Sequence, residues 1–231
     1  MAVALVCLDA DDTLWHNMRH FEAGEAALLA MLQPFADADI TRAQLTACEL
    51  RNLPLYGYGA KSFTLSMIET ATELAGDRLT AAMIRAILAA GRTLLAHPVD
   101  LFDGVADTLA LLARRSRLIL VTKGDLLHQE SKLAASGLGH LFSGVEIVSD
   151  KTSDTFRRLF DRHAVTPDHA IMAGDSLRSD ILPALAAGAW AAYIPQPGAW
   201  AHEMAAIPAG HPRFRQLARL GDLPALIDAI E

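Results

Sequence analysis

The sequence predicts an α/β fold: an open parallel sheet with helices on both faces, and an all-helical domain inserted after the first strand. Two observations carry this prediction. Over most of the chain, short apolar runs typical of buried parallel strands alternate with helical patterns. One long stretch, residues 17–97, has helical patterns and no strand-like run. The expected strands are residues 3–8, 118–121, 145–148, 170–173 and 191–194.

Helical patterns lie between the later strands. Apolar residues recur at helical spacing from Val105 to Leu112, and residues 126–136 form a second pattern that ends at Gly137. A third pattern ends at Gly188. Glycine is common directly after a helix because it adopts the left-handed conformation without strain. Strands that alternate with helices in this way predict parallel pairing.

The inserted domain is expected to span residues 17–97, and the core to comprise residues 1–16 and 98–231. The insert begins just after the first strand and ends near His97-Pro98, because proline discourages a helix from continuing. Residues 53–62 interrupt the helical pattern with glycine, proline and tyrosine, which favours a loop. The insert is therefore interpreted as a helical cap on a discontinuous core.

Composition limits the class of protein. Hydrophobic residues make up 52% of the 231 residues and charged residues 20%, which argues against a disordered chain. The net charge of −7, without a basic run, disfavours a nucleic-acid polymer as partner. The two cysteines have no metal-ligand spacing, the first residues do not form a signal peptide, and no uncharged apolar run is long enough to span a membrane. We therefore expect a cytoplasmic protein, as a monomer or a homodimer, without a membrane partner.

Acidic residues follow two of the expected strands, at the point where each strand ends. The first strand runs into Asp9-Ala10-Asp11-Asp12-Thr13, and the fourth into Gly174-Asp175-Ser176, with Asp180 shortly after. Ligands of open α/β sheets bind at the carboxyl ends of the strands. Carboxylates gathered there repel one another, and Mg²⁺, which prefers oxygen ligands, relieves that repulsion. The alternative is structural, because Asp, Ser and Thr are also ordinary turn and helix-cap residues.

A hydroxyl and an amine follow two other strands. Thr122 comes directly after residues 118–121, and Lys151 follows residues 145–148 by a short loop. Taken singly, such a threonine is usually structural and such a lysine is usually solvated. Together with the carboxylates they supply what phosphoryl transfer requires, which is positioning and neutralisation of the transferred group.

In these residues the chain resembles the haloacid-dehalogenase-like (HAD) hydrolase superfamily, in its phosphatase branch. The residues match the superfamily's four motifs in order and spacing: Asp9-Ala10-Asp11-Asp12-Thr13, Thr122, Lys151, and Gly174-Asp175 with Asp180. The resemblance covers the whole core, and the insert is similar to the superfamily's helical C1 cap. It implies a Rossmann-like core and a hydrolase that acts on a small-molecule phosphate.

The resemblance also implies a role for each motif residue. Asp9 would be the nucleophile, which forms an aspartyl-phosphate. Asp11 would be the general acid that protonates the leaving oxygen and then the base that activates water. Thr122 and Lys151 would hold the transferring phosphoryl oxygens. Asp12 stands where glycine is commonest in the superfamily, and aspartate tolerates the same turn geometry.

The resemblance implies Mg²⁺ as the cofactor. Asp9 and Asp175 would ligate the ion, Asp11 would bind it through its backbone carbonyl, and Asp180 would orient Lys151 or a metal-bound water. A zinc site is disfavoured, because the histidines show no ligand spacing.

Three further residues are candidates for substrate binding. Lys123 follows Thr122 where asparagine is common in the superfamily, and it adds a cation near the substrate. Lys61 belongs to the loop expected in the cap, which either closes over the substrate or simply connects two helices. Trp15 lies at the first crossing between core and cap, where it is either a pocket wall or a hinge residue.

The leading functional prediction is a Mg²⁺-dependent phosphatase of a small soluble phosphomonoester, of the nucleotide or sugar phosphate class. A phosphomutase would use the same motifs and return the phosphoryl group to its substrate. A non-catalytic binding protein is disfavoured because the nucleophile, acid, lysine and metal positions are all filled. A 2-haloacid dehalogenase is disfavoured because the true dehalogenases attack carbon and do not carry Asp11.

Overall fold

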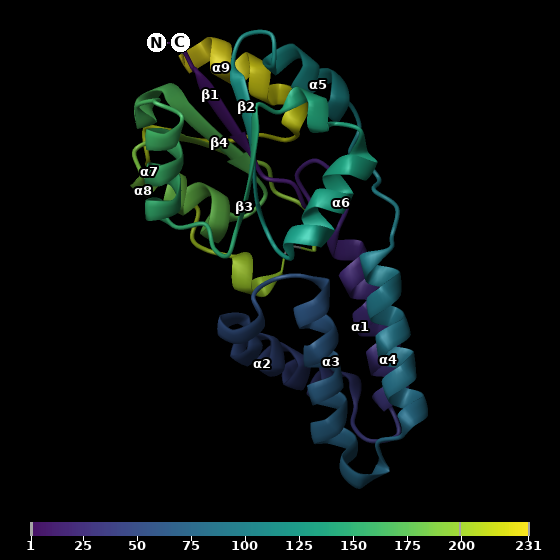
Figure 1. Ribbon diagram of the computed structural model, residues 1–231. Coiled ribbons are helices and arrows are strands. Elements are labelled where there is room, and N and C mark those ends of the chain that lie inside the picture. Colours follow the sequence, from purple (N-terminus) through teal and green to yellow (C-terminus); the bar gives the residue numbers. More distant parts are fainter. Residues whose placement is uncertain (1, 199, 231) are drawn as a thin grey trace. The chain divides into compact units, whose positions relative to one another are not determined.

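The computed structural model describes residues 2–198 and 200–230, which divide into two compact units (Figure 1). The core unit comprises Met1–Met18, Val99–Lys123 and Gln129–Glu231, and the cap unit comprises Arg19–Pro98 and Gly124–His128. Residues 124–128, assigned to the core from the sequence, cluster with the cap helices instead.

The core unit is built on one parallel sheet with the strand order β3-β2-β1-β4-β5-β6, so the α/β prediction is confirmed. The central strands are apolar on both sides, which is why they read as continuous hydrophobic runs. One strand, β6, was not predicted, because only its first residue is buried. The strands are β1 (Leu5–Leu8), β2 (Arg117–Lys123), β3 (Gly144–Val148), β4 (Ala170–Gly174), β5 (Trp190–Tyr193) and β6 (Phe214–Gln216).

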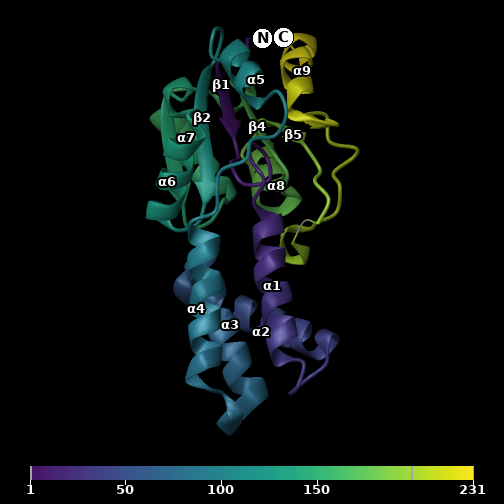
Figure 2. The same cartoon turned by 90° about the vertical axis from the view of Figure 1, so that its right-hand side faces the viewer.

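Helices cover both faces of this sheet (Figures 1 and 2). One face of β1, with Val6 and Leu8, packs against α5 (Val105–Leu112), α6 (Leu126–Ser136) and α9 (Leu223–Ile230). The other face, with Leu5 and Cys7, packs against α7 (Ser153–Arg162) and α8 (Leu182–Ala186). Alternate residues of one strand thus supply two apolar cores, as the two-residue period of a strand requires.

The cap unit contains four helices around an apolar core of its own. They are α1 (Met18–Leu32), α2 (Ala38–Tyr56), α3 (Ala60–Ala75) and α4 (Ala81–Leu95). Each contributes to the core, which includes Leu28, Leu45, Met67 and Ile87. Gly91 allows α3 and α4 to approach, because a Cβ atom there would lie 2.3 Å from the hydroxyl oxygen of Thr64.

The loop predicted at residues 53–62 is shorter than expected. Helix α2 continues through Pro54 to Tyr56, and α3 begins at Ala60. Pro54 lies in the last turn of α2, where it has no N–H to donate to the carbonyl of Leu50, so it removes one helical hydrogen bond close to the end of the helix. Gly57 ends the helix in the left-handed region with a φ of 71°. Across the described residues, no helix has the length and apolar character that a membrane span requires.

A half-buried carboxyl in the cap, that of Glu49, makes the stability of the protein depend on pH. Burial, and then repulsion from Glu25, raise the pKa of Glu49 to about 7. The folded protein therefore takes up a proton between about pH 4.5 and pH 7, and its stability falls as the pH rises through that window. We expect Glu49→Gln to stabilise the protein relative to wild type by about 1–3 kcal/mol at pH 8 and by less at pH 5. Thermal unfolding at both pH values measures this. The exposed Glu22→Gln should keep the wild-type pH dependence, and an equal effect of Glu49→Gln at both pH values would contradict the prediction.

Candidate active site

The predicted site residues of the core lie at the carboxyl edge of the sheet. Strand β1 is flanked by β2 and β4, and Leu8 is in register with Leu120 and Ala173. Asp9, the next residue, donates its backbone N–H to the carbonyl of Ala173 at 3.0 Å. The ends of these three central strands therefore meet, and the residues that follow them share one edge.

Lys151 joins two of the predicted carboxylates. Its side chain is 1% exposed, and its ammonium binds Asp9 and also Asp180, where the distance from Nζ to Oδ1 is 2.6 Å. Asp180 lies in the π-helical turn Leu177–Ile181, and its second oxygen accepts the backbone N–H of Ser176 at 3.0 Å. Gly174 leaves room for this carboxylate, because a Cβ atom there would lie 2.2 Å from Oδ2 of Asp180. The predicted contact between Asp180 and Lys151 is therefore present.

Thr13 connects the first and the last of the predicted motifs. Its hydroxyl accepts the backbone N–H of Asp175 at 3.1 Å and donates to Oδ2 of Asp9 at 3.2 Å. This hydroxyl fixes the two carboxylates relative to each other, because it is buried and belongs to the turn that begins at Asp9.

The carboxylates of Asp9, Asp175 and Asp180 converge, with one oxygen of each within 4.8 Å of the others. Burial raises the pKa of Asp9 to about 7; Lys151 opposes this rise, and the carboxylates of Asp180 and Asp11 add to it. Burial, and then repulsion from Asp9 and Asp180, hold the pKa of Asp175 well above its ordinary value. One lysine thus does not neutralise the cluster. Three carboxylates with uncompensated negative charge form a donor set that fits a hard divalent cation.

Asp11 lies outside this cluster, and its carboxylate is held by three other side chains. The indole N–H of Trp15 donates to Oδ1 at 2.6 Å, and the amide of Gln129 donates to Oδ2 at 2.9 Å. Lys132 contacts Oδ1 at 2.6 Å and Oδ2 at 2.7 Å. Burial alone would raise the pKa of Asp11, but Lys132, Gln129 and Trp15 outweigh it and hold the pKa below its ordinary value.

The carboxylate of Asp12 caps the N-terminus of α1, which begins at Met18. Its φ is 58°, and its carboxylate accepts the backbone N–H groups of Asn17 and Met18 at 2.9 and 3.0 Å. Aspartate replaces glycine here because its side chain tolerates the left-handed region and caps the free donors of α1. The carboxylate of Asp12 is therefore a helix cap, the structural role that the sequence also allowed for these aspartates.

Thr122 and Lys123 end β2, but only the threonine is held next to Asp11. The amide of Gln129 donates to the hydroxyl of Thr122 at 3.2 Å and reaches Asp11 as well. The ammonium of Lys123 turns to Glu203, at 2.7 Å from Oε1. The structure gives this amine a partner other than the substrate expected from the sequence.

Glu203 ties residues 201–203 to the edge of the sheet. Its Oε2 accepts the hydroxyls of Ser176 at 2.6 Å and Ser179 at 2.5 Å, while Oε1 accepts Lys123. Burial would raise the pKa of Glu203, but Lys123 and the two serine hydroxyls outweigh it and lower the pKa to about 2. The carboxylate of Glu203 is therefore ionised, and paired with Lys123, at neutral pH.

The two remaining substrate-binding candidates have partners within their own units. Trp15 is fully buried in the core and presents its N–H to Asp11, so it has no exposed wall for a ligand. Lys61, on α3 of the cap unit, forms an ion pair with Asp125 at 2.8 Å and is 55% exposed.

Sequence reasoning missed three residues of this edge: Gln129, Lys132 and Glu203. Gln129 and Lys132 lie on α6, three residues apart, on the helix face that turns to Asp11. The only sequence signal for them is their three-residue spacing on a helix that follows Thr122. This spacing indicates that they share a helix face, but it does not indicate that the face contacts Asp11. Glu203 lies in an irregular stretch and carries no such signal.

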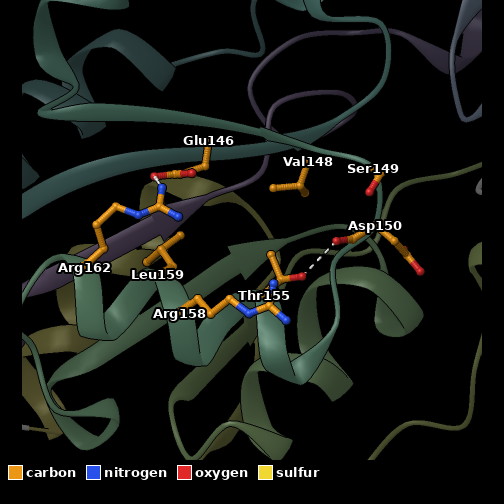
Figure 3. Close-up of a pocket in the computed structure, with 8 residues that line it drawn as sticks. All are labelled: Glu146, Val148, Ser149, Asp150, Thr155, Arg158, Leu159 and Arg162. Carbon is orange, nitrogen blue, oxygen red and sulfur yellow. Dashed lines mark hydrogen bonds and ion pairs between the residues drawn. The ribbon is translucent and has the colours of Figure 1, made fainter.

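A surface hollow lies elsewhere on the core, between β3 and α7 (Figure 3). Arg162 pairs with Glu146 there, and the hydroxyl of Thr155 donates to the carbonyl of Asp150 at 3.0 Å. The hollow is lined by Glu146, Val148, Ser149, Asp150, Thr155, Arg158, Leu159 and Arg162. None of the predicted site residues lines this hollow, so the hollow is not part of the candidate active site.

An open parallel sheet with acidic residues at its carboxyl edge, a buried lysine and an inserted helical unit defines a class of hydrolases. The sequence matches the haloacid dehalogenase-like hydrolases over residues 3–188, and the chain belongs to this family. The N-acylneuraminate-9-phosphatase of Mus musculus is 28% identical over 147 residues, which are 60% of this chain. This chain covers 56% of that relative's length.

Solved structures give the same fold. A haloacid dehalogenase-like family hydrolase from Xanthomonas campestris is 40% identical, with a TM-score of 0.89 over 99% of this chain and 92% of its own. The L-2-haloacid dehalogenase of Xanthobacter autotrophicus is 18% identical, with a TM-score of 0.69 over all of both chains. The second likeness is one of fold alone. The chain is a hydrolase of this family.

The pair Lys123–Glu203 provides a test of how this edge is built. Lys123→Met leaves the half-buried carboxylate of Glu203 without a cation, and we expect it to lower the free energy of unfolding by about 1–3 kcal/mol. The double variant Lys123→Met/Glu203→Gln removes both charges and should cost less than the single change. Urea unfolding at pH 7 measures both. A double variant as unstable as the sum of its two single variants would show that the ion pair does not couple them.

Proposed function

We propose that this hydrolase is a Mg²⁺-dependent phosphatase that releases phosphate from a small soluble phosphomonoester through an aspartyl-phosphate. The observation that carries the proposal is the convergence of Asp9, Asp175 and Asp180 around Lys151, with Asp11 held separately two residues from Asp9. Such an edge combines a carboxylate nucleophile, a lysine and a second carboxylate with its own donors.

In the first step, an oxygen of Asp9 attacks phosphorus, and the bond from phosphorus to the leaving oxygen breaks. Lys151 is buried and bonded to Asp9, so it offsets the charge of the nucleophile and is in place for the phosphoryl oxygens. Thr122, buried at the end of β2, supplies a hydroxyl for the same group. Asp11 is ionised while Lys132 holds its pKa low, so it must first take up a proton from solvent, and it then gives that proton to the leaving oxygen.

In the second step, water attacks the phosphorus of the phosphorylated Asp9, and the bond between phosphorus and the Asp9 oxygen breaks. Asp11 takes the proton of that water, and phosphate leaves. The two carboxylates have different partners, Lys151 for Asp9 and Lys132 for Asp11. This difference supports different roles for them.

Asp9 and Asp175 would hold Mg²⁺, with the backbone carbonyl of Asp11, and Asp180 would bind a water of the ion or steer Lys151. When bound, the ion offsets the charge of the carboxylates and of the phosphoryl group. Burial, together with repulsion from neighbouring carboxylates, raises the pKa of Asp9 and Asp175 even in the presence of Lys151, and this supports the assignment.

Phosphate ester chemistry is favoured over carbon–halogen chemistry by Asp11. A halide leaves without a proton, whereas the oxygen of a phosphomonoester needs one. A relative of this chain is an N-acylneuraminate-9-phosphatase, which supports a phosphorylated small molecule as substrate. We place the substrate in the nucleotide or sugar phosphate class.

Phosphate release from a panel of nucleotide and sugar phosphates tests the proposal. With Mg²⁺ we expect release from at least one compound, and EDTA should abolish it because the carboxylate cluster then repels the substrate. Asp9→Asn should lower kcat by about 10³-fold or more, since the amide is a poor nucleophile. The matched control Asp107→Asn, on the exposed side of α5, should leave kcat unchanged.

Three outcomes would count against the proposal. Undiminished release by Asp9→Asn would exclude Asp9 as the nucleophile. Halide release from a 2-haloacid without Mg²⁺ would favour the dehalogenase reaction. Transfer of the phosphoryl group to a second hydroxyl of the substrate, without release of phosphate, would favour a mutase.

A further inference from the structure

Lys132, which has no part in the function proposed above, holds the side chain of Asp11. It lies on α6, and its side chain is 4% exposed. Its Nζ lies 2.6 and 2.7 Å from the two carboxylate oxygens of Asp11 and 3.3 Å from Oδ1 of Asn17. An ammonium has three N–H donors, and these three acceptors use all of them.

The carboxylate of Asp11 is saturated in the same way. Oδ1 accepts from Trp15 and Lys132, and Oδ2 accepts from Gln129 and Lys132. A carboxylate offers about four lone-pair sites, and donors occupy all of them here. None is left to carry a proton to a leaving oxygen or to take one from water. In the role proposed above, Asp11 has to lose a donor before it acts.

Lys132 is the donor best able to leave. Trp15 is fully buried, so its ring cannot shift without disturbing a close-packed core. The amide of Gln129 has two N–H donors and three acceptors within reach, namely Asp11, the hydroxyl of Thr122 and a backbone carbonyl of β2 at 2.6 Å, so it stays anchored whichever two it serves. Lys132 is a flexible chain with a point charge at its end. Its departure leaves Asp11 with two neutral donors.

A bound phosphoryl group lies where it can draw Lys132 away. The amide of Gln129 bridges the hydroxyl of Thr122 and the carboxylate of Asp11, so a phosphoryl group on Thr122 is a close neighbour of the atoms that Lys132 contacts. A phosphomonoester carries about −1.5 to −2 charges at pH 7 and attracts an ammonium more strongly than one carboxylate does.

The other two lysines of this edge have carboxylate partners other than Asp11. Lys151 contacts two carboxylates, those of Asp9 and Asp180. Lys123 contacts Glu203 and the hydroxyl of Ser179, which itself donates to Glu203. Movement of Lys151 would leave two buried carboxylates without their cation, which is costly, whereas Asp11 keeps the donors of Trp15 and Gln129 when Lys132 leaves.

We propose that Lys132 is a second phosphoryl-binding lysine, which moves from Asp11 to the incoming phosphoryl group and thereby frees the carboxylate of Asp11. This inference rests on the proposed phosphatase function. The phosphoryl group stays in the site through both chemical steps, first on the substrate and then on Asp9. Lys132 therefore remains with it, and Asp11 stays free until phosphate departs.

Binding of orthovanadate, a phosphate analogue, tests this inference on the Mg²⁺-loaded full chain. Calorimetric titration gives its Kd, and hydrolysis of p-nitrophenyl phosphate is followed in parallel. We expect Lys132→Met and Lys132→Gln to raise the Kd by about tenfold or more, and Lys132→Arg, which keeps the charge, to stay within about threefold of wild type. The glutamine of Lys132→Gln still offers a neutral donor to Asp11 but has no charge for the phosphoryl group. This variant therefore distinguishes the two functions of Lys132, which are holding Asp11 and binding the phosphoryl group.

The double variant Lys123→Met/Glu203→Gln is the matched control. It removes another buried ion pair from the same edge, and its Kd for orthovanadate should stay within about threefold of wild type. Circular dichroism of each variant checks folding. If Lys132→Met does not fold, Lys132→Gln and Lys132→Arg give the same comparison.

The possible failures are distinct. A wild type that neither releases phosphate nor binds orthovanadate would overturn the proposed function and this inference with it. A wild type that does both, together with Lys132→Met and Lys132→Gln variants of unchanged Kd and lowered kcat, would overturn the inference alone. Lys132 would then stay on Asp11 throughout and serve only to orient it.

Discussion

Repulsion among carboxylates at the carboxyl edge of the sheet is the constraint on which the rest of this site depends. Five aspartates lie along one edge, and their negative charges are offset by different partners. Asp12 caps a helix, Asp11 is covered by Lys132, and Asp9 and Asp180 share Lys151. Asp175 has no lysine of its own among these contacts, and burial, followed by repulsion from Asp9 and Asp180, holds its pKa high. The negative charge left over is concentrated where Asp9 and Asp175 meet.

The fold imposes this crowding through the order of its strands. Because β1 lies between β2 and β4, the turn after β1 is enclosed by the ends of both neighbours. The hydroxyl of Thr13 then binds the backbone of Asp175, and Gly174 leaves space for Asp180. Local turn chemistry therefore supports the sheet at the same points where it assembles the site. Two lysines of this edge, Lys132 and Lys151, offset part of the negative charge through direct contacts with the aspartates.

The strand ends could be predicted from sequence, but their partners could not. A buried parallel strand reads as an apolar run, so the residue after it is placed without knowledge of the tertiary structure, as for Asp9, Thr122 and Asp175. Lys132 lies ten residues beyond Thr122 on a helix, and its partner depends on how that helix packs on the sheet. Glu203 comes from a stretch without periodicity. β6, three residues long, has too little apolar sequence to be recognised.

Fold similarity to a haloacid dehalogenase and sequence similarity to a phosphatase are compatible, because a shared fold does not determine which reaction the site catalyses. The sheet and cap set the scaffold, whereas the chemistry depends on whether the leaving group needs a proton. A halide does not, so a dehalogenase has no use for a second carboxylate surrounded by proton donors beside its nucleophile. Asp11 has Trp15, from the segment after β1, and Gln129 and Lys132, both from α6, arranged around it. The polar side chains that hold Asp11 beside Asp9 therefore favour a leaving group that needs a proton, such as the oxygen of a phosphomonoester.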